Sequence, residues 1–304
     1  MYTFLNFKNN MKYLHLTDDF TPFSKTFSDI ILYSSFTFNG GEPHLKISLP
    51  DKRSRIMITS RINNTEDLFK IQLAADVLTN SGICKELYLF VPYFPGARQD
   101  RRTSNEEPLT VKVYDDIINS IGFEEVIIFD PHSDVTPALL NNCTVIDNIE
   151  LVSTIINNYL GYDRDDYYLV SPDGGAIKKT NKIAVVLNSN VVYGSKNRNI
   201  STGELTNIKI DCDDLKGKPC IIVDDICDGG GTFIGLAEEL KKKNSGELFL
   251  VVSHGIFSKG FKELSKYFTE IYTTDSIRTE FNWEQQEREK TNLVTIIPLN
   301  SIIC

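Results

Sequence analysis

Short apolar runs alternate with helical patterns along this chain, and this succession restricts its fold more than any other feature. Seven runs have the length and composition of buried strands, at residues 55–59, 86–91, 125–129, 167–170, 191–193, 219–223 and 248–252. Between them, apolar residues recur at helical spacing over 65–80, 110–121 and 232–243. The first helix opens at Thr65 in a pattern that resembles a capping box. Strands and helices in repeated succession predict an α/β fold whose mainly parallel sheets are covered on both faces.

The chain is long enough for two such domains. It has 304 residues, and one series of strands and helices ends and another begins near residues 141–155. We therefore expect an N-terminal lobe over 1–147 and a C-terminal lobe over 148–304. In doubly wound sheets, ligands bind beyond the carboxyl ends of the strands, so a site should be sought in the loops that follow each strand.

The formal net charge of -9 excludes some classes of partner. A negative surface repels phosphate backbones, and the longest basic run is only 241–243, so we expect no general nucleic-acid binding. No apolar run approaches the roughly 20 residues that span a bilayer, so we expect no membrane segment. Residues 1–13 have neither the apolar core nor the cleavage site of a secretory signal, which predicts a cytoplasmic protein.

The most informative segment spans 220–232 and reads Cys-Ile-Ile-Val-Asp-Asp-Ile-Cys-Asp-Gly-Gly-Gly-Thr. An apolar strand leads into Asp224 and Asp225, and three consecutive glycines then open a helix. Glycines allow backbone N–H groups to converge on an anion at a helix N-terminus, which predicts a phosphate-binding loop. Because carboxylates repel phosphate, we expect the acidic pair to be exposed after the strand, facing sugar hydroxyls or a divalent cation. The alternative is a plain Gly-rich turn with solvated acids.

A second loop follows the strand at 86–91. Residues 91–102 read Val-Pro-Tyr-Phe-Pro-Gly-Ala-Arg-Gln-Asp-Arg-Arg. Three arginines with Gln and Asp in five positions suit a polyphosphate or a base, because guanidinium groups are planar and multidentate. The alternative is a solvated loop.

Two more strand ends carry candidate metal ligands. Asp-Pro-His at 130–132 and Ser-Pro-Asp-Gly-Gly at 171–175 present Asp130, His132 and Asp173. Oxygen donors with at most one imidazole suit Mg²⁺ that is held jointly by the protein and nucleotide phosphates. A polar strand-to-loop segment at 193–204 carries two cations two residues apart, and alone it would be taken for a surface loop.

Taken together, these segments resemble the ribose-phosphate pyrophosphokinase family, the phosphoribosyl pyrophosphate synthetases, over roughly residues 36–275. Val-Asp-Asp-Ile-Cys-Asp-Gly-Gly-Gly-Thr resembles the family's ribose-phosphate loop, and Tyr-Phe-Pro-Gly-Ala-Arg-Gln-Asp-Arg-Arg resembles its ATP loop. Asp-Pro-His resembles its Mg²⁺-binding motif, and Val-Ser-Pro-Asp-Gly-Gly its second metal and ribose-binding turn. Ser-Lys-Asn-Arg resembles its flexible catalytic loop, and Ser-His-Gly-Ile-Phe-Ser at 253–258 matches a further family segment.

The resemblance implies two tandem phosphoribosyltransferase-like doubly wound lobes, the first with the ATP loop and the second with the ribose-phosphate loop. It implies transfer of the β,γ-diphosphate of ATP to the anomeric hydroxyl of ribose 5-phosphate, which yields phosphoribosyl pyrophosphate and AMP. It also implies Mg²⁺ as the cofactor and a homo-oligomer, either a dimer or a hexamer built from dimers.

The resemblance further implies four groups of site residues. The cations that close over the transferring diphosphate are Lys196 and Arg198. The ATP-binding residues are Phe38, Glu42, Arg98, Gln99, Asp100 and Arg101. The ribose-phosphate-binding residues are Asp224, Asp225, Asp228, Gly229, Gly230, Gly231 and Thr232. The metal ligands are Asp130, His132 and Asp173.

Two positions depart from the family pattern and leave alternatives open. In Phe38-Asn-Gly-Gly-Glu42, Gly40 stands where the family has Asp. Gly229 replaces the usual Thr of the phosphate loop and opens space beyond the 5′-phosphate, so a larger acceptor such as ADP-ribose is the first alternative. A phosphoribosyltransferase is the second, although it has no need of the arginine loop or of a second lobe. An inactive regulatory homologue is the third, although such proteins usually lack the Lys-x-Arg pair or the metal His found here.

Overall fold

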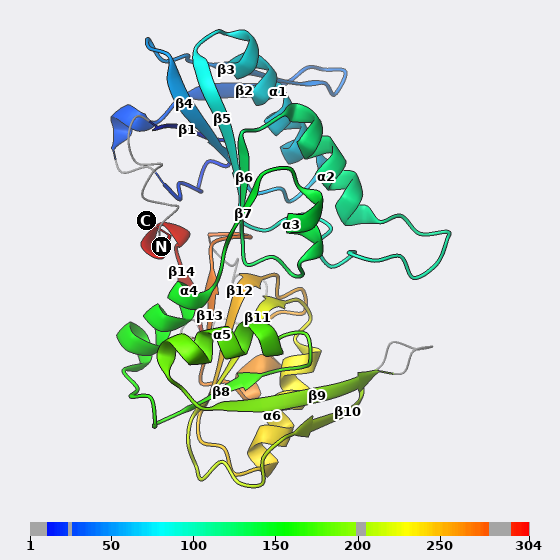
Figure 1. Ribbon diagram of the computed structural model, residues 1–304, viewed down its shortest axis with the longest axis vertical. Helices are drawn as coiled ribbons and strands as arrows, with labels where there is room; N and C mark the ends of the chain where they lie inside the picture. Colours follow the sequence, from blue (N-terminus) through cyan, green and yellow to red (C-terminus); the bar gives the residue numbers. More distant parts are fainter. Residues whose placement is uncertain (1–10, 24–25, 199–204, 280–292, 304) are drawn as a thin grey trace. The chain divides into compact units, whose positions relative to one another are not determined.

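The computed structural model describes residues 11–23, 26–198, 205–279 and 293–303, and gives the backbone alone for 196–198 and 205–207 (Figure 1). The chain divides into two compact units, residues 1–147 with 303–304 and residues 148–302. Each unit is built on a mainly parallel sheet with helices, which confirms the predicted α/β fold. Within the described residues, no helix is both long enough and apolar enough to cross a membrane.

The first unit holds a five-stranded parallel sheet in the order β1-β4-β5-β6-β7. Its strands are β1 (Met11–His15), β4 (Ser54–Thr59), β5 (Cys84–Val91), β6 (Glu125–Phe129) and β7 (Cys143–Ile146). The helices α1 (Thr65–Asn80), α2 (Thr110–Ile121) and α3 (Val135–Leu139) lie along one side of this sheet (Figure 1). An antiparallel hairpin of β2 (Tyr33–Thr37) and β3 (Pro43–Ile47) completes the unit.

The bounds of α1 and α2 are those predicted from the sequence, but the predicted cap of α1 is wrong by one residue. Asn64, not Thr65, is the N-cap, and its side chain accepts a hydrogen bond from the amide of Asp67 at 3.0 Å. The Asp67 carboxylate in turn accepts one from the amide of Asn63 at 2.9 Å. The first bond satisfies an amide that has no partner within the helix, and the second ties the residue before the N-cap to the first turn. Helix α2 ends at Gly122, whose φ of 80° favours glycine.

Side chains of β5 alternate between two apolar layers, because successive residues of a strand point to opposite faces of a sheet. Leu87 and Leu89 belong to the core that includes residues of α1 and α2. Phe90 lies on the other face, where its ring centroid is 6.1 Å from that of Phe20 and 4.8 Å from that of Phe23. The irregular segment that follows β1 therefore helps to cover the second face of the sheet through the side chains of Phe20 and Phe23.

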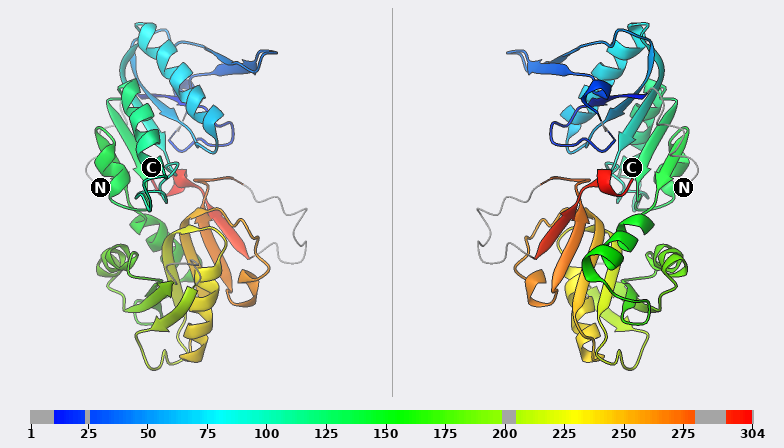
Figure 2. Two further views of the ribbon diagram at one scale, coloured as in Figure 1. Left: turned by 90° about the vertical axis from the view of Figure 1, so that its right-hand side faces the viewer. Right: turned by 90° about the vertical axis from the view of Figure 1, so that its left-hand side faces the viewer.

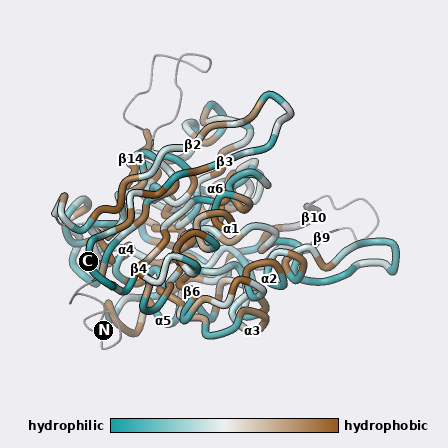
Figure 3. The backbone as a smooth tube through the Cα atoms, turned by 90° about the horizontal axis from the view of Figure 1, so that it is seen from above, coloured by the Kyte–Doolittle hydropathy of each residue, from teal (hydrophilic) through white to brown (hydrophobic). Residues whose placement is uncertain are grey.

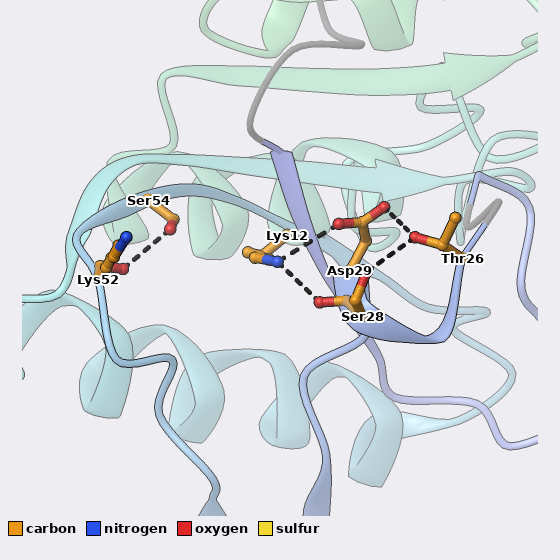
Figure 4. Close-up of polar contacts among 6 residues, drawn as sticks. All are labelled: Lys12, Thr26, Ser28, Asp29, Lys52 and Ser54. Atoms are coloured by element: carbon orange, nitrogen blue, oxygen red, sulfur yellow. Dashed lines mark hydrogen bonds and ion pairs between the residues drawn. The ribbon is translucent and has the colours of Figure 1, made fainter.

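A lysine of the edge strand β1 fixes the short helix η2 (Phe27–Asp29) that follows this segment (Figure 4). The Nζ of Lys12 donates a hydrogen bond to the carbonyl oxygen of Ser28 at 2.7 Å and lies 3.3 Å from Asp29 Oδ1. The other carboxylate oxygen of Asp29 accepts a hydrogen bond from the Thr26 hydroxyl at 2.5 Å. These contacts hold the backbone of η2 against the edge of the sheet.

The second unit holds a seven-stranded sheet in the order β10-β9-β8-β11-β12-β13-β14, in which only β10 is antiparallel to its neighbour. Its strands are β8 (Tyr168–Ser171), β9 (Val191–Arg198), β10 (Leu205–Ile210), β11 (Cys220–Cys227), β12 (Leu248–Gly255), β13 (Glu270–Thr274) and β14 (Val294–Ile297). Helices α4 (Ile149–Thr154) and α5 (Ile177–Leu187) cover one face, and α6 (Gly231–Lys242) covers the other (Figure 2). On the α6 side, Cys220 and Ile222 of β11 share a core with Leu236 and Leu240.

Candidate active site

Three residues, Asp228, Gly229 and Gly230, separate the strand β11 from the helix α6. Gly230 is the N-cap of α6 and has a left-handed φ of 79°. A Cβ built on Gly230 would lie 3.1 Å from the Cδ2 of Leu264, so both backbone conformation and space favour glycine there. The first amides of an α-helix have no partner within the helix, and the helix dipole favours an anion at this end. The short loop therefore suits a phosphate group.

Asp224 and Asp225 lie within β11 rather than after it. The hydrogen-bonded ladder to β12 continues to Cys227 and pairs Asp224 with Val252. Asp225 is only 6% exposed, and its amide donates a hydrogen bond to Asp224 Oδ1 at 2.9 Å. The predicted exposed pair beyond the strand is therefore wrong, because the apolar run ends at Val223 while the backbone pairing continues through the acids.

Crowding of carboxylates shapes the chemistry of this strand end. Burial raises the pKa of the Asp224 carboxyl well above its ordinary value, and the negative charges of Asp225 and then Asp173 raise it further. A ligand that donates hydrogen bonds or brings positive charge would stabilise the ionised form of this group. Sugar hydroxyls and divalent cations both meet that requirement.

The turn after β8 brings Asp173 to the same neighbourhood. One carboxylate oxygen of Asp173, Oδ1, accepts hydrogen bonds from the amides of Gly175 at 2.8 Å and Ala176 at 3.2 Å, just before α5 begins. Strand β9 passes so close to this turn that a Cβ built on Gly194 would lie 2.8 Å from the carbonyl oxygen of Pro172. A side chain at position 194 would therefore push β9 away from the turn that carries Asp173.

Gly229 does not face an empty space, contrary to the expectation of extra room beyond the loop. A Cβ built on it would lie 3.3 Å from both the Cδ and the Cε of Lys259. The sequence-based interpretation missed Lys259, although this residue directly follows the segment 253–258 that carries part of the family resemblance. No local pattern indicates that a residue after β12 covers a loop after β11.

A second, longer loop joins β5 to α2 and is mostly hydrophilic (Figure 3). Phe94 and Ala97 are buried and fix its first part. Gly96 has a φ of 71°, and a Cβ there would lie 3.2 Å from the backbone nitrogen of Val111 in α2. Beyond this anchored part lie four of the predicted ATP-binding residues. The side chains of Arg98, Gln99 and Arg101 are exposed, and that of Asp100 is half-buried.

The other two predicted ATP-binding residues flank the turn of the β2–β3 hairpin. Phe38 is 52% exposed, and its ring centroid lies 4.8 Å from that of Phe36. A Cβ built on Gly40 would lie 2.5 Å from the Oε2 of Glu42. The Glu42 carboxylate therefore folds over the position where the family pattern has an aspartate, and the hairpin presents aromatic rings beside one carboxylate.

Two of the predicted metal ligands follow β6 in the first unit. Asp130 is buried with a left-handed φ of 39°, and its amide donates a hydrogen bond to the carbonyl oxygen of Ile146 at 2.8 Å. His132 is exposed. Across the described parts of the chain, no three His, Cys, Asp or Glu side chains lie close enough to hold a metal ion by themselves. The metal-binding roles of Asp130, His132 and Asp173 stay predictions.

The predicted catalytic pair lies on β9. The strand extends from Val191 to Arg198 and pairs with β10, so the backbone at Lys196 and Arg198 is strand rather than the predicted loop. Their side chains, and residues 199–204, lie outside the described part of the structure. The catalytic roles of these two residues stay predictions.

A buried polar cluster at the carboxyl ends of β1 and β4 was missed by the sequence-based interpretation. His15 Nδ1 and Thr59 Oγ1 are 2.6 Å apart, and burial lowers the pKa of His15 to about 4, so its ring is neutral at pH 7. Arg61, 3% exposed, pairs with Asp19 at 2.8 Å and lies 4.6 Å from the ring centroid of Phe20. Polar residues directly after an apolar run were the available signal.

Comparison with known proteins is consistent with these features. Residues 138–290 match the phosphoribosyl transferase domain family. Curated ribose-phosphate pyrophosphokinases from Pyrococcus abyssi and Thermococcus kodakarensis are each 30% identical to the chain, over 80% of it and over 83% and 84% of their own lengths. The crystal structure of phosphoribosylpyrophosphate synthetase from Mycobacterium smegmatis has the same fold, with a TM-score of 0.78, 18% identity, and coverage of 97% of this chain and 96% of that one.

Proposed function

This chain belongs to the ribose-phosphate pyrophosphokinase family, and we propose that it transfers the β,γ-diphosphate of ATP to the anomeric hydroxyl of ribose 5-phosphate. The products are phosphoribosyl pyrophosphate and AMP. The main support from the structure is the short loop between β11 and α6, which contains the left-handed Gly230 and follows a strand that carries two acids. Backbone amides for a phosphate and carboxylates for hydroxyls match the two ends of a phosphorylated sugar.

The acceptor is held at both of these ends. The amides of residues 229–232 bind its 5′-phosphate, since backbone N–H groups at a helix N-terminus favour an anion. Asp224 and Asp225 accept hydrogen bonds from the ribose hydroxyls, and those donors offset the crowding that raises the pKa of Asp224. The sugar is then positioned with its anomeric hydroxyl available for reaction, which lowers the entropic part of the barrier.

ATP is bound by the long loop and the hairpin. Arg98 and Arg101 hold the triphosphate through planar, multidentate guanidinium groups, and Gln99 and Asp100 complete the polar contacts. Phe38 offers an exposed aromatic ring for the base, and Glu42 lies beside it on the same turn.

In the transfer step, the anomeric oxygen forms a bond to the β-phosphorus while the bond from that phosphorus to the α-phosphate oxygen breaks. The hydroxyl loses its proton, and AMP leaves. Lys196 and Arg198 contact the negative charge that develops on the diphosphate, which is where a fixed cation lowers the barrier most.

Mg²⁺ fits the donor set of these strand ends. The carboxylates of Asp224, Asp225 and Asp173 would contribute hard oxygen ligands alongside the substrate phosphates, and Asp130 with His132 would contribute a separate pair of donors in the first unit. These residues would hold the ion together with the substrate phosphates, where it would supply positive charge to the diphosphate. The cytoplasmic location and the homo-oligomeric state stay predictions.

No observation favours ADP-ribose as the acceptor. The curated relatives are named for ribose phosphate, and the Lys259 side chain lies where the absent side chain of Gly229 was expected to leave room. ADP-ribose therefore serves best as a control substrate.

The proposal is tested by incubating the protein with ATP and Mg²⁺, adding ribose 5-phosphate, ADP-ribose or no acceptor, and measuring AMP and product mass by mass spectrometry. We expect AMP and phosphoribosyl pyrophosphate to form only when ribose 5-phosphate is the acceptor. Lys196→Ala should lower turnover by about 10²-fold or more with little change in nucleotide affinity. A product formed only from ADP-ribose, or no AMP with any acceptor, would contradict the proposal.

A further inference from the structure

A turn after β12, residues 256–260, is fixed against the start of the phosphate loop. The carbonyl oxygen of Cys227 accepts hydrogen bonds from the amides of Ile256 at 2.9 Å and Phe257 at 3.0 Å. The amide of Ser258 donates to the carbonyl oxygen of Asp228 at 3.1 Å, and its hydroxyl donates to Asp228 Oδ1 at 2.5 Å. Four hydrogen bonds therefore hold the two segments in one register.

The next residue, Lys259, covers the loop at Gly229. A Cβ on Gly229 would lie 3.3 Å from the Cδ and the Cε of Lys259 and 3.6 Å from its Cγ, so the aliphatic stem of the lysine passes directly over the glycine. The ammonium group is one covalent bond beyond Cε. Lys259 is exposed, and within the described residues its ammonium has no carboxylate partner. The lysine therefore places a positive charge close to the glycine loop.

The charge balance of this strand end favours such a cation. Asp224, Asp225 and Asp228 lie within five residues of one another on the same strand and loop. Backbone amides carry no net charge, and a helix N-terminus is equivalent to only about half an elementary charge. A phosphate dianion brought next to these carboxylates is repelled by them, and a full positive charge close to the loop weakens that repulsion.

We propose that Lys259 binds the terminal phosphate of the acceptor and makes that phosphate a requirement for productive binding. This inference rests on the proposed function of the loop. A side chain at position 229 would force the lysine stem to shift by a few tenths of an ångström, so the glycine and the lysine fit closely together.

The test compares Lys259→Gln, which keeps most of the stem and removes the charge, with Lys259→Arg, which keeps the charge. We expect Lys259→Gln to raise the KM for ribose 5-phosphate about ten- to a hundredfold, with kcat and the KM for ATP nearly unchanged, because a hydrogen bond to a charged group is lost. Lys259→Arg should recover most of the affinity. Lys266→Gln is the matched control. Lys266 is an exposed lysine beyond the turn 256–260, and its Nζ pairs with Glu263 at 2.6 Å.

The two proposals fail in different ways. Wild-type protein that releases no AMP with ribose 5-phosphate would overturn the proposed function. Wild-type turnover with an unchanged KM in Lys259→Gln would overturn only the role of the lysine. A fall in kcat with an unchanged KM would also overturn it, because the lysine would then act on the transferred diphosphate and not on the acceptor phosphate.

Discussion

Two strand–loop–helix segments, one in each compact unit, are proposed to bind anions in different ways. Between β11 and α6 the loop has three residues, is pinned by hydrogen bonds to a neighbouring turn, and offers backbone amides. Between β5 and α2 the loop has its buried anchors at Phe94 and Ala97 and then exposes its charged side chains. Anion binding by the short loop therefore depends on backbone shape, whereas binding by the long loop depends on the charge and geometry of individual side chains.

This contrast predicts which substitutions matter in each unit. In the short loop between β11 and α6 and in the strand before it, added atoms or altered carboxylates should weaken acceptor binding. In the long loop between β5 and α2, loss of a guanidinium group should weaken nucleotide binding and leave acceptor binding unchanged.

Asp224→Asn should lower turnover by about 10³-fold or more, because it removes a carboxylate proposed to contact the reacting sugar. The free energy of unfolding, measured by denaturant titration at pH 8 without Mg²⁺ or substrate, should be no lower than that of the wild type. The reason is that burial and the charge of Asp225 raise the pKa of Asp224, so its ionised form costs the folded state stability above its ordinary pKa. Asp213→Asn, a change at an exposed residue of the second compact unit, should alter neither the turnover nor the free energy of unfolding.

A strongly destabilised Asp224→Asn protein would show that the carboxylate is structural. The ribose-binding role of the acidic pair would then lose its main support. The contrast between the short loop and the long loop would have to rest on the glycines alone.

The helices that follow the two loops differ as well. Helix α6 buries only apolar or small side chains, whereas α2 buries Asp115, neither of whose carboxylate oxygens has a hydrogen-bond partner among the described residues. Burial, and secondarily the charge of Asp116, raises the pKa of Asp115 to about 7. The folded state therefore prefers the protonated acid, and its stability falls as the pH rises from the ordinary pKa through about 7.

Relative to Asp115→Asn, the wild type should accordingly lose about 2 to 3 kcal/mol of unfolding free energy between pH 5 and pH 8. Denaturant titrations at the two pH values measure this difference, and any pH-independent cost of the new amide cancels. Asp116→Asn, an exposed change one residue away, should shift the same difference by less than about 1 kcal/mol. Parallel pH profiles for Asp115→Asn and the wild type would mean that the Asp115 carboxyl is hydrated in solution.

The two left-handed glycines provide a matched pair. Gly230→Ala and Gly96→Ala should each lower the free energy of unfolding by about 1 to 2 kcal/mol, because each forces a Cβ into an unfavourable φ and a close contact. Kinetics should separate them: the first should raise the KM for ribose 5-phosphate and the second the KM for ATP. Gly174→Ala, where a Cβ meets no heavy atom within 4 Å, is the stability control. Equal effects of both variants on both substrates would remove the distinction between the loops.

Arg98→Ala should raise the KM for ATP about tenfold, which corresponds to about 1.4 kcal/mol, and leave the KM for ribose 5-phosphate unchanged. Arg98→Lys should recover only part of this loss, since an ammonium cannot reproduce the planar fork. Full recovery in steady-state kinetics would indicate that the long loop contributes charge alone, without defined side-chain geometry.

Sequence patterns predicted the periodic parts of the fold and missed its edges. Helices α1 and α2 were predicted with their observed bounds, because their apolar spacing and the glycines that follow are local signals. The strands missed were β1, β2, β3, β7, β10, β13 and β14, since a short strand near an edge of a sheet or in a separate hairpin needs no long apolar run. The acids of β11 were placed outside their strand because hydropathy ends before backbone pairing does.

The candidate site was predictable to the extent that it is local. The glycine loop and the arginine loop are continuous segments whose residue types reveal their chemistry. The contact of Lys259 with Gly229 depends on two loops that lie side by side only after β11 and β12 have paired, and sequence spacing contains no information about that register.

The pairing of β11 with β12 also determines the stage of folding at which Lys259 reaches the phosphate loop. Ser258 and Asp228, which join the turn to the loop, are thirty residues apart in the chain, so their hydrogen bond closes a long loop and forms only when two central parallel strands align. A nascent chain that ends before β12 would possess the glycines but lack the lysine that we place over them. Amides of the turn and of the β11–β12 ladder should therefore become protected from hydrogen exchange in one cooperative step, so that phosphate recognition arises together with the sheet.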